Sequence, residues 1–364
     1  MKSSSSAMQD LIFVYPGDLS SPTGGYAYDR RMIEGLERRG WQIQLLSLGD
    51  GYPFLDPTQK NFARSQLLDL AQGVPMVIDG LALGALPELV SEIANRHPVI
   101  ALIHHPLAFE YGLKDPEIKL LKHSETEALK HVVGVIANSP TTARDLNQHY
   151  GVNAERVHVV LPGTDRSRRL EHRIQKNVDD FSPVNLLSVG SIIPRKGFHD
   201  LILALVPLME LPWTLTIAGD TSRHAEAYAR LKIDIKHYHL EDRVKVLGVV
   251  TNEALENLYA KADIFVLASL FEGYGMVFAE AMAHGLPIIA TSGGAIPDTV
   301  PKEAGLLVAP GDVPALTTAL KTLILDPPYR ARLSSGALQA ALLQPTWEES
   351  IQNFESALNY FIPS

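Results

Sequence analysis

The sequence contains no cysteine, so it forms no disulfide bond and offers no thiolate ligand to a metal ion. It also lacks an uninterrupted apolar run long enough to cross a membrane as a helix. Basic residues are in the minority, since 32 Lys and Arg stand against 41 Asp and Glu and leave a net charge of −9. This balance argues against a nucleic-acid-binding surface. We therefore expect no nucleic-acid partner, and the absence of cysteine fits a cytoplasmic location.

Several motifs of phosphate and metal chemistry are missing as well. No Asp-x-Asp pair occurs, so the arrangement that holds a metal ion against a diphosphate is absent, and we expect no metal. The sequence has no G-x-x-x-x-G-K-[ST] loop, no G-x-G-x-x-G fingerprint, no G-x-S-x-G elbow and no H-E-x-x-H. P-loop, dinucleotide-binding, serine-hydrolase and zinc-protease chemistries therefore find no support.

Short apolar runs alternate with helical stretches along the chain, a pattern that predicts parallel α/β sheets. A length of 364 residues allows two hydrophobic cores. The rhythm breaks at residues 163–183, and residues 165–180 are dense in charge, so we expect the interdomain connection there. The prediction is a flexible tail at residues 1–10, an N-terminal domain at 11–168 and a C-terminal domain at 169–345. A last helix is expected over 346–361.

The most informative stretch runs from residue 263 to residue 298. Residues 263–268 are nearly all apolar, as expected of a strand that is buried on both faces. Gly273 and Gly275 permit a tight backbone path, and a helix is predicted from about Met276 to His284. A glycine loop that leads into a helix presents N–H groups and a positive dipole end to an anion.

Two carboxylates bracket this loop. Glu272 precedes it, and Glu280 lies eight positions further on, inside the predicted helix. A carboxylate beside an anion site is suited to accept hydrogen bonds from the hydroxyls of a sugar or a ribose. The alternative is an ordinary βαβ unit with two solvated glutamates, and the loop and helix alone favour that alternative.

Arg195 and Lys196 follow the predicted strand 184–189 and Gly190. Two cations at a strand end can neutralise a diphosphate, Arg as a planar fork and Lys as a point charge. The alternative is a solvated basic pair on a loop.

The first half of the chain offers a second set of candidates. Gly24 and Gly25 can bring the backbone close to a ligand, or can form a plain turn. His104 and His105 follow the predicted strand 99–103, where a histidine can donate a hydrogen bond to a sugar hydroxyl or serve as a structural residue.

Residues 272–287 read E-G-Y-G-M-V-F-A-E-A-M-A-H-G-L-P and resemble the E-x7-E signature of the retaining glycosyltransferases of family 4. Other landmarks of that family are matched along nearly the whole chain after the tail, most strongly in the second half. They are residues 22–25, 138–139, 161–165, 189–197, 217–220 and 243–248. The resemblance implies the α/β GT-B fold, in which two Rossmann-like domains face an interdomain cleft. It also implies that the last helix returns to the first domain.

The resemblance assigns roles to individual residues. Glu272 would lie at the transferred sugar, and Glu280 would hold the ribose hydroxyls. The catalytic set would be His104, Glu272, Arg195 and Lys196, with His105 as the alternative histidine. The donor-binding set would add Gly24, Gly25, Gly190, Gly273, Tyr274, Gly275, Met276, Val277 and Glu280. The Tyr274 hydroxyl would reach the acceptor or water.

The implied function is a retaining, metal-independent transfer of a sugar from a UDP- or GDP-sugar to an acceptor hydroxyl, in glycan, polysaccharide or glycolipid synthesis. The nucleotide sugar is the donor substrate, no cofactor is expected, and the acceptor is a sugar, a lipid-linked or a small molecule. The alternatives are a nucleotide-sugar epimerase or hydrolase, and a non-catalytic nucleotide-sugar-binding subunit. Arginine pairs at 30–31 and 38–39 leave a weak peripheral contact with the inner membrane face as an option beside a solvated helix face.

Overall fold

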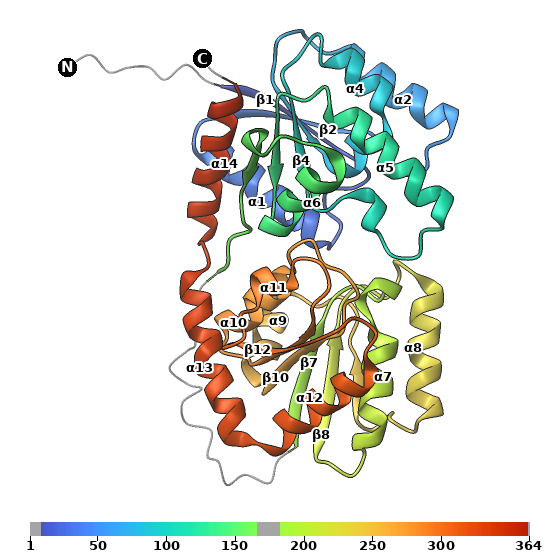
Figure 1. The fold of residues 1–364 in the computed structure, drawn as a ribbon, viewed down its shortest axis with the longest axis vertical. Helices are drawn as coiled ribbons and strands as arrows, with labels where there is room; N and C mark the ends of the chain where they lie inside the picture. Colours follow the sequence, from blue (N-terminus) through green and yellow to red (C-terminus); the bar gives the residue numbers. More distant parts are fainter. Residues whose placement is uncertain (1–8, 166–182, 363–364) are drawn as a thin grey trace, which may run out of the picture. The chain divides into compact units, whose positions relative to one another are not determined.

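The computed structural model describes residues 9–165 and 183–362 (Figure 1). The chain divides into two compact units. Unit 1 comprises the residues up to Gly163 together with those from Trp347 onward, and unit 2 comprises Thr164–Thr346. The expected boundary at residue 168, most of the expected tail and most of the charged connection lie outside the described residues.

Unit 1 is built on a six-stranded parallel sheet with the strand order β2-β1-β3-β4-β5-β6. Its strands are β1 Asp10–Tyr15, β2 Gln42–Ser47, β3 Met76–Asp79, β4 Val99–Ile103, β5 Gly134–Ala137 and β6 Val157–Val159. Its helices are α1 Gly24–Arg38, α2 Pro57–Leu68, α3 Gly80–Ala85, α4 Pro87–Ile93, α5 Asp115–Leu129, α6 Pro140–Tyr150 and α14 Trp347–Phe361, with short 3₁₀ turns at Leu107–Phe109 and Ala154–Arg156. Helices cover both faces of the sheet (Figure 1).

Unit 2 repeats this plan, with the parallel strand order β12-β11-β10-β7-β8-β9. Its strands are β7 Val184–Val189, β8 Trp213–Ala218, β9 Val244–Val246, β10 Ile264–Leu267, β11 Ile288–Thr291 and β12 Gly305–Val308. Its helices are α7 Phe198–Leu205, α8 Ala225–His237, α9 Asn252–Lys261, α10 Met276–Ala283, α11 Ile296–Thr299, α12 Val313–Leu325 and α13 Pro327–Leu343, with 3₁₀ turns at Pro194–Lys196 and Val206–Leu208. Helix α7 packs on α8 and α12, whereas α10 packs on α13.

The sequence explains where these elements lie. Central strands such as β4 and β10 are apolar and fully buried, because helices on both faces of a parallel sheet leave no solvated side. Helices begin at local caps. The Thr23 side chain accepts from the Tyr26 N–H at the start of α1, and Ser139 accepts from the Thr142 N–H at the start of α6. Each unit has its own hydrophobic core.

Helix α14 is part of unit 1. Phe354 is fully buried, and its ring and that of Trp347 both lie 6.4 Å from the ring of Tyr28 on α1. Arg39, just after α1, pairs with Glu355 at 2.6 Å and with Glu348 at 2.9 Å. The Ser350 hydroxyl donates to the Leu161 carbonyl at 2.8 Å. The last helix thus closes the first domain by an apolar seam with ion pairs at its edge.

Both sheets contain a point where the chain reverses its direction across the sheet. In unit 1 this point lies between β1 and β3, and in unit 2 it lies between β7 and β10. At such a switch point the loops from two neighbouring strands leave the carboxyl edge in opposite directions and open a crevice for a ligand. The residues that follow β1, β3, β7 and β10 are therefore the first candidates for a site.

Candidate functional site

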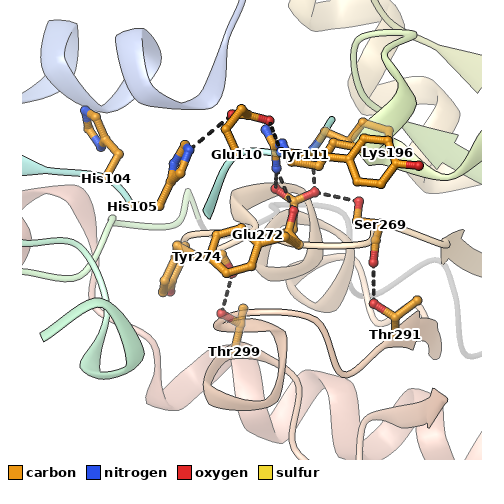
Figure 2. A network of polar contacts seen from close by, with 12 residues as sticks. His104, His105, Glu110, Tyr111, Lys196, Ser269, Glu272, Tyr274, Thr291 and Thr299 are labelled. Carbon is orange, nitrogen blue, oxygen red and sulfur yellow. Dashed lines mark hydrogen bonds and ion pairs between the residues drawn. The ribbon is translucent and has the colours of Figure 1, made fainter. Parts of the chain in front are cut away.

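In unit 2 the switch point brings together the two segments that the sequence singled out. Arg195 and Lys196 follow β7, and Glu272 follows β10, so residues that are 76 and 77 positions apart become neighbours. Lys196 Nζ lies 2.6 Å from Glu272 Oε1, and Arg195 donates to Glu272 Oε2 at 3.1 Å. The Ser269 hydroxyl also donates to Glu272 Oε1, at 2.6 Å (Figure 2).

This cluster is buried and its charges are linked. The Lys196 and Arg195 side chains are 13% and 15% exposed, and that of Glu272 is 7% exposed. Burial acts to raise the pKa of Glu272, but the charges of Lys196 and Arg195 and the hydrogen bonds from Lys196 and Ser269 lower it to about 2. Burial lowers the pKa of Lys196, and Glu272 opposes that effect. The cluster therefore joins two cations to one carboxylate.

The backbone around Glu272 is fixed by its neighbours. Glu272 forms an isolated parallel β-bridge with Gly294, and its carbonyl accepts from the Ala295 N–H at 2.8 Å. A Cβ atom on Gly294 would collide with that carbonyl. On the other side, Gly197 has φ +66°, and a Cβ atom there would collide with the Ala268 carbonyl. Glycine is therefore needed at 294 for the loop after β11, and at 197 for the loop after β7, to approach the segment that follows β10.

Helix α10 starts at this cluster. Its N-cap is Gly275, with φ +86°, and in the described part of the chain no side chain caps it. The first amides of α10, at Met276 and Val277, therefore point toward the loop end of the helix, where the dipole is positive. Gly190 lies beside the Lys196 stem, because a Cβ atom at Gly190 would be 3.3 Å from Lys196 Cε. The combination of two cations and a bare helix start is suited to an anion.

Glu280 lies on α10 and belongs to a second polar network. The Tyr259 hydroxyl donates to Glu280 Oε2 at 2.8 Å, and Tyr259 stacks on His284 with 4.9 Å between the ring centroids. His284 Nε2 lies 3.0 Å from Glu256 Oε2. Burial raises the pKa of Glu280, and the Tyr259 hydrogen bond opposes the rise. One oxygen of Glu280 is thus held by Tyr259.

Tyr274 lies differently from the sequence-based expectation. Its ring is 4% exposed, and its hydroxyl donates to Gln344 Oε1 at 2.8 Å within unit 2. Its carbonyl accepts from the Thr299 hydroxyl at 2.7 Å (Figure 2). We had expected the Tyr274 hydroxyl to reach the acceptor or water. It is instead a structural group that fixes the loop to Gln344.

In unit 1 the carboxyl edge of the sheet carries the predicted glycines and histidines. Gly24 and Gly25 form the first residues of α1. Gly25 packs against His104, since a Cβ atom at Gly25 would be 3.3 Å from His104 Cδ2. His105, next in the chain, points its Nε2 at Glu110 Oε2, 3.2 Å away (Figure 2).

His104 is surrounded by acids that the sequence reading missed. Its Nε2 lies 3.0 Å from Asp29 Oδ1 and 3.5 Å from Asp79 Oδ2. In the described part of the chain this is the group of acids and histidine that could hold a metal, with its ligand atoms within 4.8 Å of one another. The imidazole between the two carboxylates can itself supply the positive charge. Asp79, at the carboxyl end of a buried strand, could have been found by its position, whereas Asp29 is one of several polar residues on α1.

The basic residues of α1 have partners within unit 1. Arg30 donates to the carbonyls of Leu19 and Ser21, the Arg31 guanidinium lies 5.2 Å from the centre of the Trp347 ring, and Arg39 pairs with α14. These contacts account for three of the four arginines in the pairs that suggested a membrane contact. Over the residues that the structure covers, no helix is both long and apolar enough to span a bilayer.

Two Rossmann-like domains, each with a parallel sheet and a polar cluster at its carboxyl edge, define the GT-B class of α/β proteins. The family model "Glycosyltransferase Family 4" matches residues 24–168, and the model "Glycosyl transferases group 1" matches residues 170–340. The chain belongs to glycosyltransferase family 4.

Curated relatives that are named as glycosyl- and mannosyltransferases match the chain over part of their length. The chain is 32% identical to D-inositol 3-phosphate glycosyltransferase of Xylanimonas cellulosilytica, over 59% of this chain and 54% of that protein. It is 24% identical to MMP alpha-(1->4)-mannosyltransferase of Mycolicibacterium hassiacum, over 72% of this chain and 66% of that protein. The matches thus span less than two thirds of these relatives.

Solved structures agree in fold. Sucrose-phosphate synthase from Thermosynechococcus elongatus superposes with a TM-score of 0.81 at 19% identity, over 97% of this chain and 98% of that chain. Anabaena Alr3699/HepE in complex with UDP superposes with a TM-score of 0.70 at 21% identity, over 97% of this chain and all of that chain.

Proposed function

We propose that the protein is a retaining glycosyltransferase that moves a sugar from a nucleotide-diphosphate sugar to an acceptor hydroxyl without a metal ion. The observation that carries the proposal is the cluster of Arg195, Lys196 and Glu272 at the switch point of unit 2, beside the uncapped start of α10. Both cations are suited to contact a diphosphate, Arg195 as a planar fork and Lys196 as a point charge. Family membership supports the same reading.

The proposed reaction exchanges one bond at the anomeric carbon for another. The bond from that carbon to the diphosphate oxygen breaks, and its electron pair leaves with the phosphate. The acceptor hydroxyl attacks from the face that the diphosphate vacates, and its proton passes to the departing phosphate oxygen. Arg195, Lys196 and the amides at the start of α10 stabilise the charge that develops on the leaving group. Glu272, ionised and held by both cations, positions the sugar.

The nucleotide would be held by Glu280 and the donor loop. Tyr259 occupies Glu280 Oε2, so the other carboxylate oxygen is the one to accept a ribose hydroxyl. The backbone from Gly273 to Val277 would contact the diphosphate and the sugar.

The sequence left two histidines as candidates for the sugar contact, with His104 as the first candidate and His105 as the alternative. His104 lies against Gly25, with Asp29 and Asp79 at its Nε2, and its side chain is 17% exposed. His105 contacts the Glu110 carboxylate, and its side chain is 23% exposed. We propose His104 for the sugar contact, because it lies beside the glycine pair of the proposed donor-binding set, and keep His105 as the alternative.

Relatives suggest which donors and acceptors to test. One is named for GDP-mannose, and Alr3699/HepE has been solved with UDP-glucose. Others are named for D-inositol 3-phosphate and for mannosylfructose-phosphate. The acceptor class proposed here is a sugar or an inositol phosphate.

Screening UDP- and GDP-sugars by thermal shift, followed by product analysis with and without acceptors, tests the proposal. Acceptor-dependent transfer, with the anomeric configuration of the donor kept in the product by NMR, is the expected result. Release of free sugar or an epimerised nucleotide sugar without any acceptor would instead identify a hydrolase or an epimerase. Donor binding without turnover would identify a binding subunit.

A further inference from the structure

Glu280, the residue proposed to hold the ribose, has its side chain fixed from a neighbouring helix. Tyr259 on α9 donates its hydroxyl to Glu280 Oε2 at 2.8 Å. The Tyr259 ring is 1% exposed and contacts two other rings, since its centroid lies 6.1 Å from that of Phe265 on β10 and 4.9 Å from that of His284. A buried ring with these neighbours keeps its hydroxyl at the carboxylate.

His284 fixes the backbone of the same residue. Its Nδ1 lies 2.9 Å from the Glu280 carbonyl oxygen, which can only accept, so Nδ1 carries a hydrogen and donates. Its Nε2 lies 3.0 Å from Glu256 Oε2 on α9. Helix α9 therefore holds Glu280 at two points, through Tyr259 at the carboxylate and through Glu256 and His284 at the carbonyl.

Tyr259 leaves Glu280 with one oxygen to offer a ligand. Burial and the Glu280 charge raise the pKa of Tyr259 well above its ordinary value, so the phenol keeps its hydrogen and remains a donor. Glu280 is partly exposed, and in the described part of the chain Tyr259 is the hydrogen-bond partner of its carboxylate. Burial raises the pKa of Glu280, and the Tyr259 hydrogen bond acts against that rise. The other oxygen of Glu280 is thus kept in one direction as an acceptor.

We propose that Tyr259, supported by His284, is a positioning residue that fixes Glu280 for the ribose and makes the site prefer ribonucleotides over nucleotides that lack the ribose hydroxyls. The inference rests on the proposed function, in which the donor is a nucleotide-diphosphate sugar. A fixed acceptor discriminates well, because a ligand without the hydroxyl leaves the acceptor unpaired. Without the Tyr259 hydroxyl the carboxylate can turn and is more readily neutral, so it holds ribose weakly and discriminates little.

The test replaces Tyr259 by Phe, which removes the hydroxyl and keeps the ring. Calorimetry with UDP and GDP, and with their 2′,3′-dideoxy forms, measures the preference for ribose. Loss of both hydroxyls should weaken binding by about tenfold or more in the wild type and by about threefold or less in Tyr259→Phe. Inorganic pyrophosphate, which has no ribose, should bind both proteins equally. Tyr238→Phe, at a partly buried ring of the same unit, is the matched control.

A double-mutant cycle separates positioning from a structural role. If Tyr259 acts through Glu280, Tyr259→Phe should weaken binding of UDP or GDP about fivefold or more in the wild-type background and change it little in the Glu280→Ala background. Transfer assays should show a raised KM for the donor with kcat within about twofold, because the ribose is remote from the reacting carbon.

An equal preference for ribose in Tyr259→Phe and the wild type would overturn the inference, and so would equal effects of Tyr259→Phe in both backgrounds. Weaker binding of pyrophosphate by Tyr259→Phe would also overturn it, because the substitution would then disturb the whole site. A wild-type protein that binds pyrophosphate but neither UDP nor GDP would remove the proposed function together with the inference. The titration of the wild type therefore distinguishes the two failures.

Discussion

The Lys196 ammonium is the side chain that the proposed chemistry uses most directly. It contacts Glu272 at 2.6 Å and is 13% exposed, so water screens its charge little. We predict that Lys196→Ala weakens binding of a nucleoside diphosphate and slows transfer, by about 2–4 kcal/mol in the transition state. Calorimetry and steady-state kinetics measure the two effects. Lys302→Ala, at a side chain that is 92% exposed, is the control. Unchanged binding and rate in Lys196→Ala would contradict the assignment.

Glu272 should make the free energy of unfolding depend on pH in the acidic range. Its pKa is about 2 in the folded protein against an ordinary value of 4.5. A carboxyl group with a lowered folded pKa stabilises the fold above its unfolded pKa, and this contribution is lost as the pH falls through the folded value. The free energy of unfolding should therefore fall between pH 4.5 and 2 more steeply in the wild type than in Glu272→Gln, by on the order of 3 kcal/mol.

Denaturant unfolding at several pH values measures the difference, with Glu303→Gln, at a side chain that is 61% exposed, as the control. Parallel curves for the wild type and Glu272→Gln would show that the ion cluster does not hold Glu272 ionised in the fold.

The residues of the site differ in how far the sequence could predict them. Glu272, Glu280, Arg195 and Lys196 stand out because their spacing matches a family signature. Glu272 pairs with Lys196 because the strand order places β10 beside β7. A local sequence pattern does not predict the order of strands in a sheet. The inward turn of Tyr274 depends on Gln344, 70 residues away. The role of Asp29 was not predicted, because the sequence alone does not distinguish a buried polar residue on a helix from the solvated polar residues beside it.

Elements were predicted better than contacts. Apolar runs located the strands to within about two residues, as at β10, because a strand buried on both faces leaves a continuous apolar pattern. The extent of α10 was also predicted, from about Met276 to His284, and Gly285 directly after it has φ +67°. The loops between elements could not be placed in the same way, since their paths depend on tertiary neighbours.

The close approach of the loops after β7 and β10 leads to a prediction about the stability of unit 2. Gly197 and Gly311 both have positive φ, but a Cβ atom would collide with the Ala268 carbonyl only at Gly197, since Gly311 has nothing within 4 Å. Gly197→Ala should therefore destabilise unit 2 by about 1–3 kcal/mol more than Gly311→Ala. Denaturant unfolding of both variants measures the difference. Equal losses would mean that backbone strain alone, and not the close approach of the loops, requires glycine.

Metal independence is a property to test on the whole molecule. The sequence lacks Asp-x-Asp, and the proposed diphosphate site contains two cations, Arg195 and Lys196. We expect nucleoside diphosphate to bind with the same affinity in the presence and absence of EDTA. Calorimetry of the purified protein measures both. Binding that disappears with EDTA and returns with magnesium would show that the cations of unit 2 are insufficient.

The return of α14 to unit 1 has a consequence for synthesis on the ribosome. Unit 2 is one continuous segment, whereas unit 1 is assembled from both sides of it. During translation the second domain is therefore complete before the first. The apolar surface of α1 around Tyr28, which Trp347 and Phe354 cover, stays bare until α14 has emerged. This apolar surface of α1 therefore remains exposed while the whole of unit 2 is synthesised. We expect a chaperone to bind the nascent chain at this surface.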